Sequence, residues 1–415
     1  MAIEVCGGCR LSGGIRLQGS KNAVLPLMAA SLLCEGTTIL TNCPKISDVQ
    51  AMQEVMQALG SFVIDEGHRL SLDHSGFSNT YICMEKVRDL RASVLLMGSC
   101  LARFGEVTIA YPGGCSIGRR PIDFHIQAFR KMGVRIEEDE DRICCHCDKG
   151  LYGADITLPF PSVGATENIL LASVRAEGRT ILRNAAREPE IEELCRFLRG
   201  AGASLQGEGT SCIEIEGRGQ LHGIEWNMSG DRIAFLTYAM LTAGCGGEIT
   251  LQSEDLFGEK EREVWHTLGG REEVRKDEVI LKKSGAIAPI HYLDTGPYPE
   301  FPTDGQSLLL PVLARAHGVS TIEERVFENR FRMISQLQKM GANIDHVSNR
   351  ARITGVTKLH GAEVTALDLR SGAGLLIAAA MAEGTSTIFG EEYIKRGYEN
   401  ITECLNELGI KAKYV

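Results

Sequence analysis

The feature that most constrains the fold of this chain is a unit that recurs six times along it. In each unit an apolar helical stretch ends at a glycine, and a β-rich run follows. These six glycines lie 66 to 73 residues apart, at Gly36, Gly105, Gly178, Gly247, Gly318 and Gly384. A second helical segment ends at another glycine 22 to 28 residues later in every unit. Six near-equal spacings predict an internal repeat.

Each repeat combines helices with strands. A glycine supplies the left-handed backbone that ends a helix, and the Thr, Ile and Val residues that follow it favour a strand. The first helix of a repeat, as in residues 23–33, 92–102 and 168–176, is apolar on nearly all sides, which is typical of a buried helix. We therefore predict an α/β protein with two inside-out α/β domains, each of three repeated units with buried helices and outer sheets.

The domain boundary is expected near residue 230, after the polar segment 226–232. The first lobe would span residues 21–229, and the second would combine residues 1–20 with 230–415. Counting repeats indicates that the N-terminal strand, within residues 2–10, completes the second lobe. The chain would then cross between the lobes near residues 20 and 230, which predicts a cleft of the kind where ligands bind.

The charge of the chain limits its partners. With a formal net charge of −10 over 415 residues, it lacks the basic excess that is typical of nucleic-acid-binding proteins. Residues 2–20 have no signal-peptide pattern, and no apolar run reaches the roughly 18 residues needed to span a membrane. We expect a cytoplasmic protein that binds neither nucleic acid nor membrane. An anionic substrate would require cations gathered locally.

The 14 cysteines are expected to be reduced thiols, because disulfides are rare in the cytosol. Two cysteine clusters raise the alternative of zinc, Cys6 with Cys9 and the run at 144–147. Neither has a correctly spaced second half nearby, and both lie in strand-like segments. We therefore expect no metal site.

Residues 112–125, PGGCSIGRRPIDFH, carry the strongest chemical signal. Their glycines allow the backbone to lie close to a ligand. Cys115 lies five residues before Arg120, and neighbouring cations lower the pKa of a thiol and raise its reactive thiolate fraction. The segment predicts an activated thiol beside an anion clamp.

Other candidates lie at the starts of predicted helices. Lys21 follows Ser20, a plausible N-cap, and a lysine at a helix start favours anions; the alternative is a surface turn. Arg91 either extends its charge to solvent or binds phosphate. Residues 161–166 offer amides and hydroxyls for a diphosphate. Asp304 follows a proline-rich loop, and the alternative there is an N-cap. Three arginines at element ends of the second half would converge with those of the first on a polyanion if the lobes close: Arg330, Arg370 and Arg396.

Taken together and in this order, the motifs resemble the UDP-N-acetylglucosamine enolpyruvyl transferase family of the EPSP synthase superfamily. The resemblance covers essentially the whole chain. It rests on GSKNA, LRAS, PGGCSIGRRPIDFH, SVGATEN, NAAREPEI, PEFPTD, VFENRF, DLRSGAG and RGYE. It implies transfer of the enolpyruvyl group of phosphoenolpyruvate to the 3′-hydroxyl of UDP-N-acetylglucosamine with release of phosphate, the first committed step of peptidoglycan synthesis. It implies no metal or organic cofactor.

The resemblance also implies roles for individual residues. Cys115 would protonate phosphoenolpyruvate, form a covalent adduct with it and react with the epoxide fosfomycin, while Asp304 would take the hydroxyl proton. Lys21 and Arg396 would act with them in catalysis. The residues expected to bind phosphoenolpyruvate are Lys21, Asn22, Arg120 and Arg396. Those expected to bind UDP-N-acetylglucosamine are Asn22, Arg91, Arg120, Pro121, Ile122, Asp123, Phe124, Ser162, Val163, Gly164, Asp304 and Val326.

Two alternatives remain. A shikimate-3-phosphate enolpyruvyl transferase would share the fold and the chemistry, but the Cys115 loop and the UDP-sugar motifs disfavour it. A catalytically weak, regulatory paralogue is the second. It is suggested by departures from the family pattern at Phe160, Gly296, Glu300 and Gly305, whereas the presumed chemical groups are all present.

Overall fold

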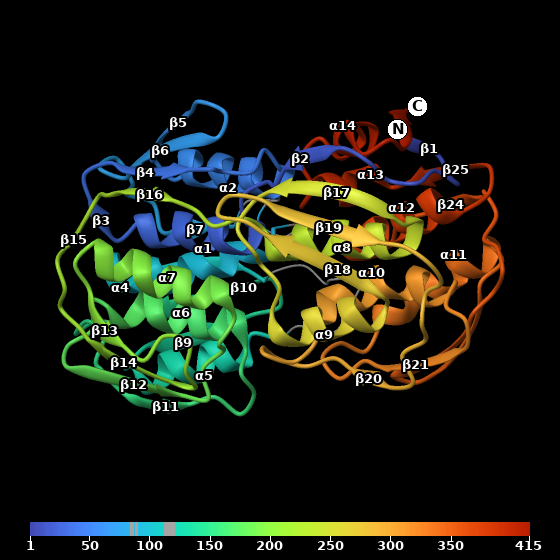
Figure 1. Ribbon diagram of the computed structural model, residues 1–415. Coiled ribbons are helices and arrows are strands. Elements are labelled where there is room, and N and C mark those ends of the chain that lie inside the picture. Colours follow the sequence, from blue (N-terminus) through green and yellow to red (C-terminus); the bar gives the residue numbers. More distant parts are fainter. Residues whose placement is uncertain (84–86, 88–89, 112–120) are drawn as a thin grey trace. The chain divides into compact units, whose positions relative to one another are not determined.

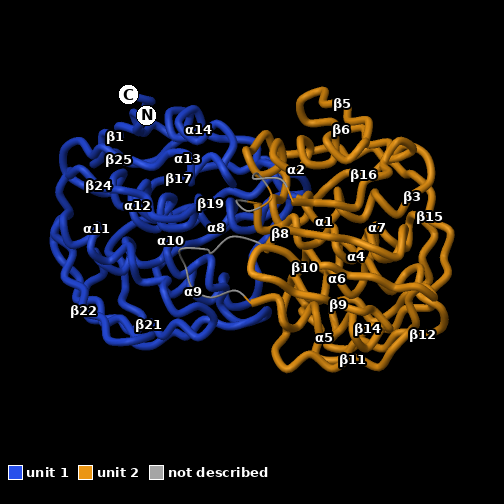
Figure 2. Tube along the Cα trace, turned by 180° about the vertical axis from the view of Figure 1, so that it is seen from behind, with its two compact units in different colours: residues 1–18, 115–119, 230–415 blue, residues 19–114, 120–229 orange. Residues whose placement is uncertain are grey.

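The computed structural model describes residues 1–415 except 84–86, 88–89 and 112–120. The predicted site residues Cys115 and Arg120 therefore lie outside the described residues. In the described part, contacts cluster the chain into two compact units, coloured separately in Figure 2. Unit 1 contains residues 1–18 and 230–415, and unit 2 contains the described residues between 19 and 229.

Unit 2 contains three four-stranded sheets of one topology, β16-β4-β6-β5, β7-β8-β10-β9 and β11-β12-β14-β13. In each sheet the first two strands pair in parallel and the others pair antiparallel. A short sheet pairs β3 (Cys34–Glu35) with β15 (Leu221–His222). The strands of the larger sheets are β4 (Thr38–Thr41), β5 (Phe62–Asp65), β6 (Arg69–Asp73), β7 (Tyr81–Ile82), β8 (Glu106–Ala110), β9 (Arg135–Glu138), β10 (Arg142–His146), β11 (Asp155–Thr157), β12 (Arg179–Arg183), β13 (Ser204–Gln206), β14 (Cys212–Glu216) and β16 (Glu225–Asn227).

Unit 1 repeats this topology in three sheets, β2-β17-β19-β18, β20-β21-β23-β22 and β24-β25-β1-β26. In the last sheet β1 lies between β25 and β26, antiparallel to both. Figure 1 shows the two chain ends side by side, and Ala2 N donates to Val415 O over 2.8 Å. The strands are β1 (Ala2–Cys6), β2 (Gly14–Arg16), β17 (Gly247–Gln252), β18 (Gly270–Val274), β19 (Val279–Lys283), β20 (Leu293–Asp294), β21 (Val319–Glu323), β22 (Asn343–Val347), β23 (Arg350–Thr354), β24 (Glu363–Thr365), β25 (Thr385–Phe389) and β26 (Lys411–Tyr414).

The helices fall into two kinds. One helix of each repeat is almost wholly buried: α1 (Lys21–Ser31), α4 (Leu96–Phe104) and α6 (Val163–Ser173) in unit 2, and α8 (Arg232–Cys245), α10 (Thr303–Leu313) and α12 (Leu369–Met381) in unit 1. The others bury one face: α2 (Ser47–Ala58), α5 (Asp123–Lys131), α7 (Pro189–Gly200), α9 (Glu259–Thr267), α11 (Ile334–Lys339), α13 (Glu391–Lys395) and α14 (Ile401–Glu407). Short 3₁₀ helices, η1 (Arg91–Leu95) and η2 (Arg330–Met333), lead into α4 and α11.

The packing follows from this division. The apolar helices α8, α10 and α12 contact one another inside unit 1, as α1, α4 and α6 do in unit 2. Strands alternate buried and more exposed residues, as in β6 and β25, so each sheet turns one face to the helices. The predicted α/β class with buried helices and outer sheets is confirmed. No helix within the described residues is long and apolar enough to cross a membrane.

Candidate functional site

In unit 2, the predicted substrate-binding residues lie where helices begin. Lys21 and Asn22 open α1, Arg91 opens η1, and Ser162 immediately precedes α6. Ser20 and Ser162 cap their helices by accepting backbone N–H groups, from Ala23 over 3.3 Å and from Ala165 over 3.4 Å. The N-cap predicted at Ser20 is thus confirmed, and the first turn of a helix is a position that favours an anion.

A buried amide in the middle of α6 links this helix to η1, α4 and α5. The Nδ2 of Asn168, on α6, donates to Val94 O of η1 over 2.8 Å and lies 2.9 Å from His125 Nδ1 of α5. Its Oδ1 accepts from Gly98 N of α4 over 2.7 Å. Asn168 was not among the predicted residues, although an amide on a helix expected to be buried was a usable signal, because a buried amide requires partners.

Helices α5 and α6 carry the other described UDP-sugar candidates of unit 2. Pro121 is exposed and Ile122 is the buried N-cap residue of α5, while Asp123 and Phe124, both half-buried, form its first turn. Val163 and Gly164 form the first turn of α6. The predicted residues from 121–124 and 162–164 therefore lie on two helix starts that the His125–Asn168 contact brings together.

Lys21 is paired with a carboxylate. Its Nζ lies 2.8 Å from Asp48 Oδ2, and the side chains are 13% and 9% exposed. Asp48 lies in the first turn of α2. The ion pair fixes the ammonium group at the start of α1 and leaves part of it open to solvent. Sequence reasoning did not identify Asp48, because an acidic residue in a first helical turn is common on any surface helix.

In unit 1, Asp304 lies at the centre of a buried charge cluster. It belongs to the first turn of α10, whose N-cap is Pro302, so the alternative that Asp304 is the N-cap is wrong. Instead Asp304 Oδ2 accepts from Arg370 Nε over 2.9 Å, and its Oδ1 accepts from Arg330. The carboxylate is 24% exposed, whereas each guanidinium is 4% exposed.

This cluster corrects the expectation for two arginines. Arg330 and Arg370 were predicted to offer their charge to a polyanion, but both are buried and pair with Asp304. Burial is the largest single influence on the pKa of Arg370 and acts to lower it, but the charges of Asp304, Tyr398 and Asp231 and the hydrogen bond to Tyr398 together outweigh burial and raise the pKa. Both guanidinium groups therefore hold the carboxylate of Asp304 in one position.

Glu324, which sequence reasoning also missed, organises the neighbouring turn. It is 2% exposed, and its Oε1 accepts from Thr303 Oγ1 over 3.0 Å, from Val326 N over 2.8 Å and from Phe327 N over 3.1 Å. Through these bonds the predicted sugar-binding residue Val326 lies next to the start of α10 and to Asp304.

Arg396 lies on a segment that also packs against the Asp304 cluster. It is the C-cap of α13. Two residues later the buried Tyr398 places its hydroxyl 3.3 Å from Arg370 Nη1 and 2.7 Å from Thr237 Oγ1 of α8. Asp304, Val326 and Arg396 thus belong to one region of unit 1.

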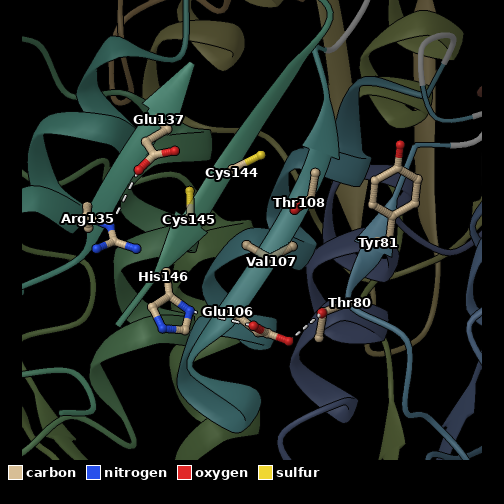
Figure 3. Close-up of a pocket in the computed structure, with 10 residues that line it drawn as sticks. All are labelled: Thr80, Tyr81, Glu106, Val107, Thr108, Arg135, Glu137, Cys144, Cys145 and His146. Carbon is tan, nitrogen blue, oxygen red and sulfur yellow. Dashed lines mark hydrogen bonds and ion pairs between the residues drawn. The ribbon is translucent and has the colours of Figure 1, made fainter. Parts of the chain in front are cut away.

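A separate pocket lies on the sheet that contains β7, β8, β9 and β10 (Figure 3). Its volume is about 420 Å³, and it is lined by Cys144, Cys145 and His146 among others. His146 lies 2.6 Å from Asp148 and 3.6 Å from Glu106. In the described part of the chain, no group of three or more His, Cys, Asp or Glu side chains is arranged to hold a metal ion, and the predicted site residues do not line this pocket.

Comparison with known proteins places the chain in a family. Residues 5–405 match the family model described as EPSP synthase (3-phosphoshikimate 1-carboxyvinyltransferase). The UDP-N-acetylglucosamine 1-carboxyvinyltransferase of Acinetobacter baylyi is 40% identical over 412 residues, 99% of each chain. That of a Wolbachia pipientis strain is 42% identical over 408 residues, 96% of each chain.

Solved structures agree on the fold. The enolpyruvyl transferase NikO from Streptomyces tendae has a TM-score of 0.90 at 22% identity, covering 99% of this chain and 98% of that one. EPSP synthase from Acinetobacter baumannii has a TM-score of 0.76 at 19% identity, covering 100% of both chains. The resemblance inferred from the motifs is confirmed: the chain belongs to the EPSP synthase family and, within it, to the enolpyruvyl transferases named UDP-N-acetylglucosamine 1-carboxyvinyltransferase.

Proposed function

We propose that this enzyme transfers the enolpyruvyl group of phosphoenolpyruvate to the 3′-hydroxyl of UDP-N-acetylglucosamine, in the cytoplasm, as the first committed step of peptidoglycan synthesis. The methylene carbon of phosphoenolpyruvate gains a proton, and the hydroxyl oxygen bonds to the adjacent carbon. The resulting tetrahedral ketal loses a proton and phosphate, which restores the double bond. The observation that carries the proposal is the partly exposed side chain of Asp304, whose carboxylate is paired with two buried guanidinium groups.

Asp304 would remove the proton of the attacking hydroxyl. A general base must lie within hydrogen-bond reach of that proton and keep one orientation. The salt bridges to Arg330 and Arg370 supply the orientation, and the 24% exposure of the side chain leaves it open to a ligand. Val326, beside the start of α10, would contact the sugar nucleotide next to this base.

The helix starts of unit 2 would bind the sugar nucleotide. Backbone N–H groups at the start of α6, at Val163 and Gly164, suit a diphosphate, because the N-terminus of a helix attracts anions, and the side chain of Ser162 would contact it from the preceding position. Arg91 and residues 120–124 would contribute the remaining contacts. The role of Asn168 would be to keep these starts together.

Phosphoenolpyruvate would be held by Lys21, Asn22, Arg120 and Arg396. Three of these are cations, and they would offset the charge that develops on the departing phosphate. Asp48 supports this role for Lys21 by fixing the ammonium group through the 2.8 Å ion pair.

Cys115 would be the proton donor and a transient covalent partner of phosphoenolpyruvate. This role rests on the sequence, where Arg119 and Arg120 follow the thiol. Three buried thiols are poor competitors, since burial raises the pKa values of Cys100, Cys145 and Cys195 to about 12. A thiol with so high a pKa is almost entirely protonated near neutral pH and reacts slowly with electrophiles. Fosfomycin is accordingly expected to modify Cys115.

Phosphate release tests the proposed substrates. The purified enzyme is incubated with phosphoenolpyruvate and one acceptor, either UDP-N-acetylglucosamine or shikimate 3-phosphate, and inorganic phosphate is measured. Release that depends on the UDP-sugar, with none above background for shikimate 3-phosphate, supports the proposal. Release with shikimate 3-phosphate alone would establish the other transferase, and release with neither would favour a regulatory paralogue.

A further inference from the structure

We propose that Gln18 is a positioning residue that holds segment 396–399, and with it Arg396 and the Asp304 cluster, in the geometry required for the reaction. The inference rests on the proposed function, since it acts through residues assigned there. Gln18 belongs to the last residues of the chain before it leaves unit 1 for α1. Its side chain has no part in the assigned chemistry.

The side-chain amide of Gln18 binds the backbone at two points. Its Nε2 donates to Gly397 O over 2.9 Å, and its Oε1 accepts from Glu399 N over 2.9 Å. Both groups of one planar amide are thereby used, and the two bonds bracket Tyr398. Because a glutamine offers a donor and an acceptor on one rigid group, it can fix two peptide units of a segment that forms neither helix nor strand there.

Segment 396–399 carries two residues related to the proposed reaction, Arg396 and Tyr398. Arg396 directly precedes Gly397. Tyr398, which is 2% exposed, contacts Arg370 over 3.3 Å, and Arg370 in turn binds Asp304 over 2.9 Å. Gln18 is thus connected to the proposed base Asp304 through Tyr398 and Arg370. Its partner Gly397 also directly follows Arg396, a proposed phosphoenolpyruvate ligand.

The two side-chain bonds of Gln18 to segment 396–399 form what we call the Gln18 clamp, and the backbone of Gln18 joins this clamp to the start of α8. Gln18 O accepts from Asp231 N over 3.0 Å, and the side chain of Asp231 caps α8 by accepting from Ile233 N and Ala234 N, each over 2.9 Å. Helix α8 also supplies Thr237, the second partner of the Tyr398 hydroxyl. Segment 396–399 is therefore linked to α8 in two ways. Gln18 binds the segment and is itself bonded to Asp231, the N-cap of α8, and Tyr398 binds Thr237 within α8.

The test compares Gln18→Ala with a matched control, Asn406→Ala. Asn406 is also an amide that binds backbone in unit 1, donating to Thr402 O over 2.7 Å and to Ala412 O over 2.8 Å and accepting from Ala412 N over 3.1 Å. It holds α14 and β26 and not segment 396–399. Both variants lose hydrogen bonds of ordinary strength, but Gln18→Ala alone should misplace Arg396.

Steady-state kinetics supply the first readout. Gln18→Ala is expected to lower kcat/KM for phosphoenolpyruvate about tenfold, the size expected from losing two neutral hydrogen bonds, with little change in KM for the UDP-sugar. Asn406→Ala should retain wild-type kinetics. In an Arg396→Ala background, Gln18→Ala should cost much less than it does alone, since both changes remove one interaction. An unchanged kcat/KM for phosphoenolpyruvate, or full additivity with Arg396→Ala, would overturn the proposal.

Hydrogen exchange supplies a readout that does not depend on activity. The Glu399 amide should exchange faster in Gln18→Ala than in the wild type and at the wild-type rate in Asn406→Ala. Unchanged exchange at Glu399 would refute the clamp itself. If the wild type releases no phosphate with the UDP-sugar while exchange at Glu399 still responds to Gln18→Ala, the proposed function fails and the clamp stands.

Discussion

The charge of Asp304 is compensated by two guanidinium groups that have little access to water, so we expect it to contribute to stability as well as to the proposed chemistry. Asp304→Asn keeps the size of the side chain but removes the negative charge. We expect kcat to fall by about a hundredfold or more, the usual contribution of a general base, and the free energy of unfolding to fall by about 3 kcal/mol, because two buried cations lose their partner. Steady-state kinetics and urea unfolding measure the two effects.

Asp294→Asn provides the matched control for that change. Asp294 pairs with Arg325 over 2.7 Å in the same unit, but the side chains are 32% and 52% exposed. An exposed pair of this kind contributes less than about 1 kcal/mol, so both kcat and stability should stay near wild type. A folded Asp304→Asn enzyme with wild-type kcat would show that Asp304 is not the base.

His74 predicts how stability depends on pH. It is buried between Ser31 Oγ at 2.8 Å and Ser61 Oγ at 2.7 Å. Burial, aided by the charge of Arg103, lowers its pKa from 6.5 to about 4. Between these two values the unfolded chain binds a proton that the native protein does not, so the free energy of unfolding falls as the pH falls through this window.

The magnitude follows from the same shift. From about pH 7 to about pH 5 this one residue should remove about 2 kcal/mol from the free energy of unfolding. Urea unfolding of the wild type and of His74→Gln at both pH values isolates the effect. The variant is expected to be less stable at about pH 7 but to lose about 2 kcal/mol less on acidification. Equal losses in the two proteins would contradict the assignment.

At the level of elements, β1 is a central strand although it begins the chain. Ile3 pairs with Ile388 of β25 and Tyr414 of β26 and is fully buried. Ile3→Ala should lower the free energy of unfolding by about 2–5 kcal/mol. Ile64→Ala removes the same atoms from the edge strand β5, where Ile64 is 61% exposed, and should cost less than about 0.5 kcal/mol. Urea unfolding that gave equal costs would contradict a central position for β1.

Local sequence patterns predicted where helices and strands lie more accurately than they predicted which side chains contact one another. The glycine signal was reliable because it reflects backbone conformation: Gly105, for example, ends α4 with φ of 77°. Residues 91–95 form a 3₁₀ helix before α4, although the sequence predicts one helix over 92–102. Arg330 resembled a solvent-exposed charge because its partner Asp304 lies 26 residues away, and no local pattern records such a pairing.

Across the whole molecule, both units follow one plan, in which most of the predicted site residues lie where buried helices begin. In unit 1 the acidic residues at the starts of α8, α10 and α12 are Asp231, Asp304 and Asp368, and Arg330 links the last two, lying 3.7 Å from Asp368. In unit 2 Asn168 links the helix starts. The repeat predicted the buried helices, while separate motifs, and not the glycine spacing, placed the candidate residues at the helix starts. It could not predict the amide and carboxylate partners, because these join different repeats.

The chain belongs to the enolpyruvyl transferases named UDP-N-acetylglucosamine 1-carboxyvinyltransferase, and its reaction can be tested on the product itself. The most direct test is the structure of the product formed from UDP-N-acetylglucosamine and phosphoenolpyruvate labelled with heavy carbon at C2. We expect one equivalent of phosphate per product. The nuclear magnetic resonance spectrum should show a coupling between the labelled carbon and the sugar proton at C3′, transmitted through the 3′-oxygen. Unchanged UDP-sugar after prolonged incubation with folded wild-type enzyme, or a label attached at another position of the sugar, would contradict this reaction.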